Sequence, residues 1–444
     1  MSFMNTLARR VYSLLMTLGQ PLLRRKLARR GRQEPGYLEA VEERFGHYAQ
    51  PAETVPVLVW LHAVSLGETR TAAMLLKALR AQQPGLRILL THGTATGRAE
   101  GAALLQADDV QVWQPWDSPA AVARFFSHFK PRLGLLMETG IWPNMVPEAQ
   151  LRAMPLLLVN WRLSGKSLKK ARRVAPLSMP AYRALTAVFA QTAADAARFG
   201  QLGASVAGVF GNLKFDATPS TTQHSQGRAW RRAVAQPVLM FASSRDGEEE
   251  SFLRQISAVV QEGRSQYAID SVAYAGSRNV RFLIVPRHPQ RFDEVQALVA
   301  QHGLRVSRRS AWGGSPADSD DAMQADVWLG DSLGEMALYY GLSDAALLGG
   351  SFEPLGGQNL IEAAACGCPV VMGPHTFNFA EAAAQAETEG AALRVAGMAE
   401  AVPAALALMG DAPALAESVA AGLAFAARNR GAAARTVEAL KAYL

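Results

Sequence analysis

The chain has 444 residues, of which 49% are apolar and 19% are charged. This length exceeds that of one ordinary domain and the apolar fraction is enough for two hydrophobic cores, which excludes extensive disorder. The formal net charge of +7 is concentrated, because residues 1–33 contain eight Lys or Arg and no acid, and a second acid-free segment, 162–173, contains six more bases. A uniformly basic protein that binds nucleic acid is therefore not expected. The pattern indicates an acidic body with two basic patches.

The segment 1–33 combines this positive charge with an apolar helical pattern. Its apolar residues recur at helical spacing: Phe3, Leu7, Val11, Leu14, Leu15 and Leu18. Such a helix can lie in a membrane interface with its arginines against anionic headgroups. No apolar run reaches the roughly 18–20 residues of a spanning helix. We expect residues 1–33 to associate with a membrane surface; the alternative is a helix packed on the protein itself.

From Val55 onward, apolar runs alternate with helical stretches, which is typical of a parallel sheet covered by helices on both faces. The first half has six expected strands: Val57–Leu61, Arg87–Thr91, Val110–Trp113, Leu133–Met137, Pro155–Val159 and Ala187–Ala190. After a Pro/Ser/Thr/Gln-rich stretch, 217–228, that reads as a linker, the pattern restarts with five more: Val238–Ala242, Phe282–Val285, Val327–Gly330, Ala345–Leu348 and Pro369–Met372. The sequence thus predicts an α/β protein with two doubly wound, Rossmann-like domains, 34–216 and 229–444, facing a cleft. Ala-rich helices are expected to close the second domain.

Two carboxylates and one lysine of the first half stand where ligands bind in such sheets. Glu68 follows the first strand through a Ser/Gly turn, and Glu138 directly follows the fourth strand. A carboxylate at a strand's carboxyl end can act as a general base, although Glu is also common in a first helical turn, where the helix dipole favours it. Lys214, at the end of the first half, could neutralise an anionic substrate or leaving group.

The second half has several loops suited to phosphate at its expected strand ends. Arg287 lies between prolines after one strand, and residues 331–335 open a helix after another. The glycines of 349–357 permit close backbone approach, and Glu362, one turn beyond Asn359, can accept hydrogen bonds from ribose hydroxyls. Together these loops favour a pocket for a nucleotide monophosphate or a nucleotide-sugar over ordinary turns. The sequence has no P-loop and no metal-ligand spacing, so neither a P-loop ATPase nor a metal site is expected.

Nine segments of the chain resemble, in the same order, motifs of the 3-deoxy-D-manno-octulosonic acid (Kdo) transferases of Gram-negative bacteria, and they extend across almost the whole chain. Gly211–Asp216 and Gly373–Phe379 carry the most specific phrases. The segments are His62–Glu68, Glu138–Asn144, Asn160–Ser167, Gly211–Asp216, Ala242–Glu249, Val285–Phe292, Gly330–Glu335, Gly349–Glu362 and Met372–Phe379.

The resemblance implies a GT-B glycosyltransferase of family 30 that moves Kdo from CMP-Kdo to a lipid A precursor, lipid IVA, in lipopolysaccharide biosynthesis. It implies an acceptor-binding first domain, a CMP-Kdo-binding second domain, and action at the cytoplasmic face of the inner membrane without a metal or other cofactor. Glu68 would be the catalytic base, and Glu138 and Lys214 would support the transition state. The residues implied to bind CMP are Pro286, Arg287, Leu333, Gly334, Glu335, Asn359, Leu360, Ile361 and Glu362.

The chain departs from this family pattern at a few positions. Gly140 stands where a second Glu is usual, Gln358 replaces a usual His, and Ser244-Arg245 replaces a usual Thr-His. These differences affect the expected donor site but not the expected class. Two alternatives stay open on sequence alone: a nucleotide-sugar epimerase of the same architecture, and a non-catalytic, membrane-bound nucleotide-binding protein.

Overall fold

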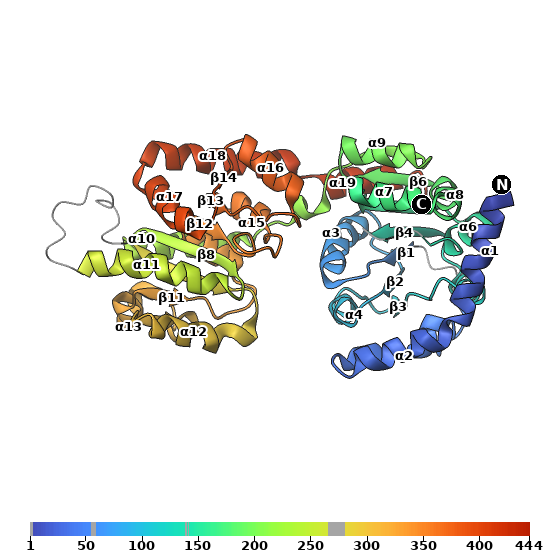
Figure 1. The fold of residues 1–444 in the computed structure, drawn as a ribbon, viewed down its shortest axis with the longest axis horizontal. Helices are drawn as coiled ribbons and strands as arrows, with labels where there is room; N and C mark the ends of the chain where they lie inside the picture. The colour runs from blue at the N-terminus through green and yellow to red at the C-terminus, as the bar shows by residue number, and fades with distance from the viewer. Residues whose placement is uncertain (1–2, 55–58, 138–139, 141, 265–279) are drawn as a thin grey trace. The chain divides into compact units, whose positions relative to one another are not determined.

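The computed structural model describes residues 3–54, 59–137, 140, 142–264 and 280–444. The chain divides into two compact units, of which the first combines Met1–Asp216 with Arg430–Leu444 and the second is Ala217–Asn429. Each unit contains a seven-stranded sheet whose paired strands are parallel, with helices packed on it (Figure 1). The expected α/β class with two Rossmann-like sheets is thereby confirmed.

The first sheet has the strand order β3-β2-β1-β4-β5-β6-β7. Its strands are β1 (Val59–His62), β2 (Ile88–His92), β3 (Val110–Trp113), β4 (Leu133–Met137), β5 (Leu156–Trp161), β6 (Ala187–Ala190) and β7 (Val206–Val209). The order reverses between β1 and β4, which pair directly. Ligands of doubly wound sheets bind beyond the carboxyl ends of strands at such a reversal. The segments that follow β1 and β4 are therefore where a site is expected.

Helices bury both faces of this sheet. Successive side chains of β1 point to opposite faces and therefore join two different cores. Val59 and Leu61 join the core formed with α3 (Leu66–Gln82) and α19 (Ala432–Leu440). Trp60 joins the opposite core, to which the remaining packed helices contribute. These include α5 (Pro119–Phe129), α6 (Met145–Leu151), α7 (Gly165–Arg173), α8 (Ala175–Ala184) and α9 (Ala193–Gln201), while α4 (Ala95–Ala102) packs on α3.

The N-terminal segment forms α1 (Phe3–Leu18) and α2 (Gln20–Gly31). Helix α1 packs on α8 (Figure 1). No residue of α1 is buried. Among the described residues, no single helix has the length and hydropathy of a membrane span. One sharply bent pair, Met398–Gly410 with Ala412–Leu440, passes that test by length and composition alone.

The second sheet has the strand order β10-β11-β9-β8-β12-β13-β14. Its strands are β8 (Val238–Ser244), β9 (Arg281–Pro286), β10 (Val306–Arg308), β11 (Val327–Leu329), β12 (Ala345–Leu348), β13 (Val370–Met372) and β14 (Ala392–Arg394). The order reverses between β8 and β12, which again pair directly. The carboxyl ends of β11, β9, β8 and β12 therefore lie side by side at one edge of the sheet.

The second unit has nine described α-helices. They are α10 (Thr221–Val234), α11 (Glu248–Arg264), α12 (Phe292–Gln301), α13 (Asp320–Gln324), α14 (Met336–Leu342), α15 (Leu360–Ala365), α16 (Ala380–Thr388), α17 (Met398–Gly410) and α18 (Ala412–Asn429). Helices α11, α12 and α17 share one core with β8 and β9. Helix α10 packs closely on α14, since a Cβ at Gly227 would lie 2.1 Å from the Leu338 carbonyl oxygen.

Two of the expected domain limits are wrong. Most of the expected linker, 217–228, belongs to α10, which Ser220 caps and which buries Trp230 and Val234. The polar residues that suggested a linker form the exposed face of this helix. Residues 430–444 belong to the first unit rather than the second, because α19 packs on α3 and Asp216 accepts hydrogen bonds from the backbone at its start.

Three strands escaped sequence analysis, namely β7, β10 and β14. All three are short and lie at sheet edges, where a strand pairs with only one other strand and its side chains are only partly buried. Their sequences consequently lack the continuous apolar run of a central parallel strand.

Candidate active site

Glu68 lies in a tightly capped turn between β1 and α3. The Ser65 side chain accepts a hydrogen bond from the Glu68 amide at 3.4 Å, and Glu68 Oε2 accepts one from the Val64 amide at 2.6 Å. This arrangement is close to a capping box, in which two otherwise unpaired backbone donors are satisfied reciprocally. The turn thus fixes the carboxylate at the carboxyl end of β1, as the sequence predicted, and gives it a structural role as well.

The Glu68 turn is supported by buried polar groups of β2 and α3. His92 Nδ1 donates to the Ala63 carbonyl oxygen at 2.9 Å, and Thr69 Oγ1 donates to the Ser65 carbonyl oxygen at 2.9 Å. His92 and Thr69 are both completely buried. The turn is therefore held by contacts within the protein.

The segment after β4 approaches the end of β1. Glu138 lies outside the described residues, so its predicted place beside Glu68 stays a prediction. Trp142 is described, and its ring contacts that of His62 edge-on, with 5.0 Å between ring centroids. His62 is the last residue of β1, so the segment that follows β4 contacts the carboxyl end of the strand that leads to Glu68.

A cluster that the sequence did not predict connects α1 to the segment that follows β4. It consists of Tyr12, Ser13, Asp117 and Asn144. Asp117 accepts hydrogen bonds from the Asn144 and Met145 amides at 3.0 and 2.8 Å and from the Tyr12 hydroxyl. Ser13 donates to the Asn144 side chain at 2.7 Å. Asp117 is buried, and burial raises its pKa to about 7. A lone Asp before a helix gave no signal for this role, since its partners are distant in sequence.

Acid is expected to destabilise the first unit through two buried histidines. Burial lowers the pKa of His62 to about 3 and that of His92 to about 4, from 6.5. The contribution of these neutral histidines to the free energy of unfolding is therefore complete above pH 6.5 and is lost as the pH falls toward 4. Asp117, with its raised pKa, acts oppositely over this range, which leaves a net loss of about 1.4 kcal/mol per pH unit.

Urea unfolding at pH 4.5 and pH 6.5 checks this expectation. His92→Gln should reduce the pH dependence, and Asp117→Asn should increase it. Equal unfolding free energies of the parent protein at the two pH values would contradict the assignment.

Lys214 lies in a 3₁₀ turn, η3 (Leu213–Asp216), that packs against α3 and α19. Asn160, at the end of β5, holds this turn by accepting a hydrogen bond from the Leu213 amide at 2.8 Å. Asn160 adopts a left-handed backbone conformation with φ of 56°, which Asn tolerates better than most residues. The structure therefore brings the segment of half-buried Lys214 against α3, the helix whose first turn contains Glu68.

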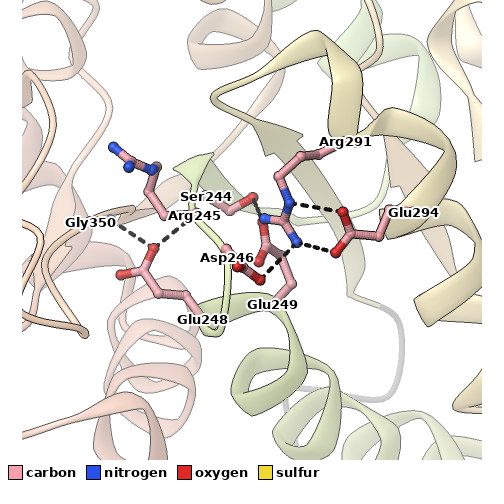
Figure 2. A network of polar contacts seen from close by, with 8 residues as sticks. All are labelled: Ser244, Arg245, Asp246, Glu248, Glu249, Arg291, Glu294 and Gly350. Carbon is pink, nitrogen blue, oxygen red and sulfur yellow. Dashed lines mark hydrogen bonds and ion pairs between the residues drawn. The ribbon is translucent and has the colours of Figure 1, made fainter. Parts of the chain in front are cut away.

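In the second unit, Glu248 joins the loops that follow β8 and β12. Its buried carboxylate accepts four backbone hydrogen bonds, from Gly350 at 2.7 Å, Arg245 and Phe352 at 3.0 Å, and Glu353 at 3.4 Å. Figure 2 shows the bonds from Gly350 and Arg245. Burial raises the pKa of Glu248, and the four donors oppose that rise. The two segments that follow β8 and β12, the strands at which the order of this sheet reverses, are thus fixed to one another.

Pro286 and Arg287 stand at the end of β9, next to this junction. Pro286 is buried, whereas Arg287 is exposed and its amide donates to the Ser244 carbonyl oxygen at 3.0 Å. Burial and the positive charges of Arg245, Arg287 and Arg291 lower the pKa of His288. The ends of β8 and β9 therefore form a positively charged region suited to an anion.

The other predicted donor residues lie at the same edge of the sheet. Leu333 is 73% exposed, Gly334 has a left-handed φ of 76°, and Glu335 pairs with Arg309 at 3.3 Å. Asn359 caps the next helix through the Ile361 amide at 3.1 Å, and burial raises the pKa of Glu362.

Two features of this edge bear on the predicted donor site. The side chains of Leu360 and Ile361 are fully buried in the core, so only their backbone is available to a ligand. Helices α14 and α15 have 7 and 6 residues, so each offers an anion only a small helix dipole. Among the described residues no group of three or more His, Cys, Asp or Glu is placed to hold a metal ion.

The chain is 42% identical over 446 residues to the 3-deoxy-D-manno-octulosonic acid transferase of Bordetella pertussis, covering 99% of this chain and 100% of that protein. The chain belongs to the Kdo transferase family. The family model described as 3-deoxy-D-manno-octulosonic-acid transferase (kdotransferase) matches residues 39–217. The Haemophilus influenzae protein of the same name is 30% identical over 98% of both chains. The resemblance drawn from the nine segments is confirmed.

Solved structures add the fold to this family assignment. Anabaena HepE in complex with UDP has a TM-score of 0.55 at 14% identity, covering 87% of this Kdo transferase and 99% of that chain. The UDP-GlcNAc 2-epimerase of Neisseria meningitidis has a TM-score of 0.53 at 14% identity, with coverages of 83% and 97%. At this identity the likeness to an epimerase concerns the two-domain fold alone. As a Kdo transferase, the chain is a glycosyltransferase enzyme.

Proposed function

We propose that this Kdo transferase moves Kdo from CMP-Kdo to a lipid A precursor during lipopolysaccharide biosynthesis. The observation that carries the proposal is the capped turn that holds Glu68 at the strand-order reversal of the first sheet. In this mechanism the Glu68 carboxylate takes the proton from an acceptor hydroxyl, whose oxygen attacks the anomeric carbon of Kdo. CMP then leaves with its phosphate neutralised by Arg287, while Glu138 and Lys214 support the transition state.

The acceptor side of the proposal is supported by the exposed bases of α7. The bases of segment 162–173 are all exposed, and the helix is anchored on its inner face by buried Leu168. Phosphate groups of a lipid A precursor are the chemistry that such a cluster would bind.

A direct reaction separates the alternatives. The purified enzyme is incubated with CMP-Kdo and a lipid A precursor, and the lipid is analysed by mass spectrometry. The proposal expects a mass increase by one or more Kdo units, which also counts them. Conversion of a nucleotide-sugar without any lipid would identify an epimerase, and CMP binding without turnover would identify a non-catalytic protein.

We further propose that α1 and α2 hold the enzyme on the cytoplasmic face of the inner membrane. Apolar side chains of α1 are unusually exposed, among them Phe3 at 80%, Leu15 at 64% and Leu18 at 68%. Helix α2 adds positive charge, of which Arg24 is paired with Glu42. An apolar ridge followed by a basic helix is typical of segments that lie in a membrane interface.

Replacing Leu14, Leu15 and Leu18 together by Gln is expected to lower vesicle binding at least about tenfold, because each buried leucine contributes roughly 1.5–3 kcal/mol. Co-sedimentation with vesicles containing anionic lipid measures the effect. The control replaces three exposed leucines outside α1, namely Leu151, Leu393 and Leu423. Equal binding of both variants would contradict the membrane role of α1.

A further inference from the structure

Two arginines flank a single backbone hydrogen bond at the carboxyl ends of β8 and β9. Arg245 follows Ser244, the last residue of β8, and the amide of Arg287 donates to the Ser244 carbonyl oxygen at 3.0 Å. The two strands are paired up to this point, with Ser244 opposite Pro286. The main chains of Arg245 and Arg287 are therefore neighbours, although 42 positions separate them in the sequence.

The charge of Arg245 is not neutralised in the way that a nearby arginine is. Arg291 pairs with Glu249 at 2.7 Å, Glu294 at 2.8 Å and Asp246 at 3.4 Å. In the described part of the chain, no acid lies within ion-pair distance of the half-buried Arg245 guanidinium, which points away from this cluster (Figure 2). A partly buried cation without a counter-ion favours an anionic ligand.

In the neighbouring glycine-rich loop, 349–357, several backbone amides are already hydrogen-bonded within the protein, so an anion would have to be bound by side chains. The amides of Gly350 and Phe352 donate to Glu248, and those of Gly357 and Gln358 donate to the carbonyl oxygens of Gly350 and Gly349. Each of these amides is already used within the protein, so they do not form the phosphate cradle that the glycines suggested. Gly349 instead permits close packing, because a Cβ there would lie 2.2 Å from the Ser243 carbonyl oxygen.

The same buried carboxylate holds Arg245 in place. Glu248 accepts the Arg245 amide at 3.0 Å and the Gly350 amide at 2.7 Å through one oxygen (Figure 2). The main chain of Arg245 is thus fixed before any ligand arrives, which reduces the entropy lost on binding. The positive charges of Arg245, Arg287 and Arg291 all act on the same neighbouring side chain, His288. Together with burial, they lower the pKa of its imidazole.

We propose that Arg245 binds the phosphate of the donor nucleotide together with Arg287. The inference rests on the proposed CMP-Kdo donor and deepens it. Two guanidinium groups from adjacent strand ends would hold a phosphate monoester from two sides, and the charge that develops on this phosphate when Kdo leaves would be met by both.

Titration with CMP and with cytidine tests the proposal on the full-length enzyme. Arg245→Gln is expected to raise the Kd of CMP about 10- to 100-fold, because a hydrogen bond to a charged group is lost, and to leave the affinity for cytidine unchanged. Arg245→Lys should recover part of the CMP affinity. The control Arg254→Gln removes an exposed arginine of α11 and should change neither Kd.

The outcomes separate this inference from the proposed function. An unchanged CMP affinity in Arg245→Gln, with tight CMP binding by the parent protein, would overturn the role of Arg245 alone. Absence of CMP binding by the parent would overturn the proposed donor and this inference with it. An equal loss of CMP and cytidine affinity would show a general distortion of the pocket and would also overturn the specific role. If Arg245→Gln does not fold, the Lys variant and the ratio of CMP to cytidine affinity decide the question.

Discussion

Replacing Glu68 with Gln is expected to lower kcat for Kdo transfer by about 10²- to 10⁴-fold, the usual contribution of a general base. The glutamine oxygen can still accept the Val64 amide that Glu68 Oε2 accepts at 2.6 Å. The turn between β1 and α3 should therefore survive, while the group that takes the acceptor proton is lost. Initial rates of Kdo incorporation into lipid, with a thermal unfolding curve for each protein, measure both effects.

A matched control for this variant is Glu438→Gln, which removes an exposed carboxylate of the same unit that pairs with Lys441. It should leave both the rate and the unfolding midpoint unchanged. Rapid transfer by Glu68→Gln would refute the role as base. A loss of activity that only parallels a loss of folded protein would leave Glu68 with its capping role alone.

Glu248→Gln is expected to destabilise the second unit by about 3 kcal/mol and to lower kcat/KM for the donor by about 10²-fold. Each carboxylate oxygen of Glu248 accepts two backbone N–H groups. An amide nitrogen in place of either oxygen would direct its own N–H groups at two donors. The loops that carry Arg245 and Gly350 would separate. Arg245 would then no longer be positioned to bind the donor phosphate.

Urea unfolding and CMP titration measure the two consequences. Glu250→Gln is the control, because Glu250 lies on the same helix with its side chain 44% exposed and pairs with Arg254 at the surface. Unchanged stability and unchanged CMP affinity in Glu248→Gln would show that the junction between the two loops does not position the donor site.

The central strands of both sheets could be predicted from the sequence because burial on two faces requires continuous apolar runs. The turn at Glu68 could also be predicted, since its capping residues Ser65 and Glu68 are local in sequence. The edge strand β7 could not, because a four-residue strand with alternate residues half-buried and exposed has no distinct pattern. Helix α10 was missed for a related reason, because only Gly227, Trp230 and Val234 are buried and its exposed face is polar.

The polar groups that support the site escaped prediction because their partners are distant in the chain. Asp117 contacts Asn144 and Tyr12, and Glu248 contacts residues more than one hundred positions away. Three consecutive acids at 248–250 indicate the start of a helix, but nothing local distinguishes the buried first member from the half-buried third. Such junctions depend on the strand order of the sheet, which the sequence did not specify.

The return of α19 to the first unit has a consequence for how the protein forms during synthesis. Ala432, Val437 and Leu440 belong to the same core as Val59 and Leu61 of β1. A ribosome therefore releases every strand of the first sheet long before the helix that completes its core, and the whole second unit is made in between. The second unit can fold first while the part of this apolar face that α3 does not cover stays open to solvent. A nascent chain arrested before residue 430 would present that face to chaperones and proteases.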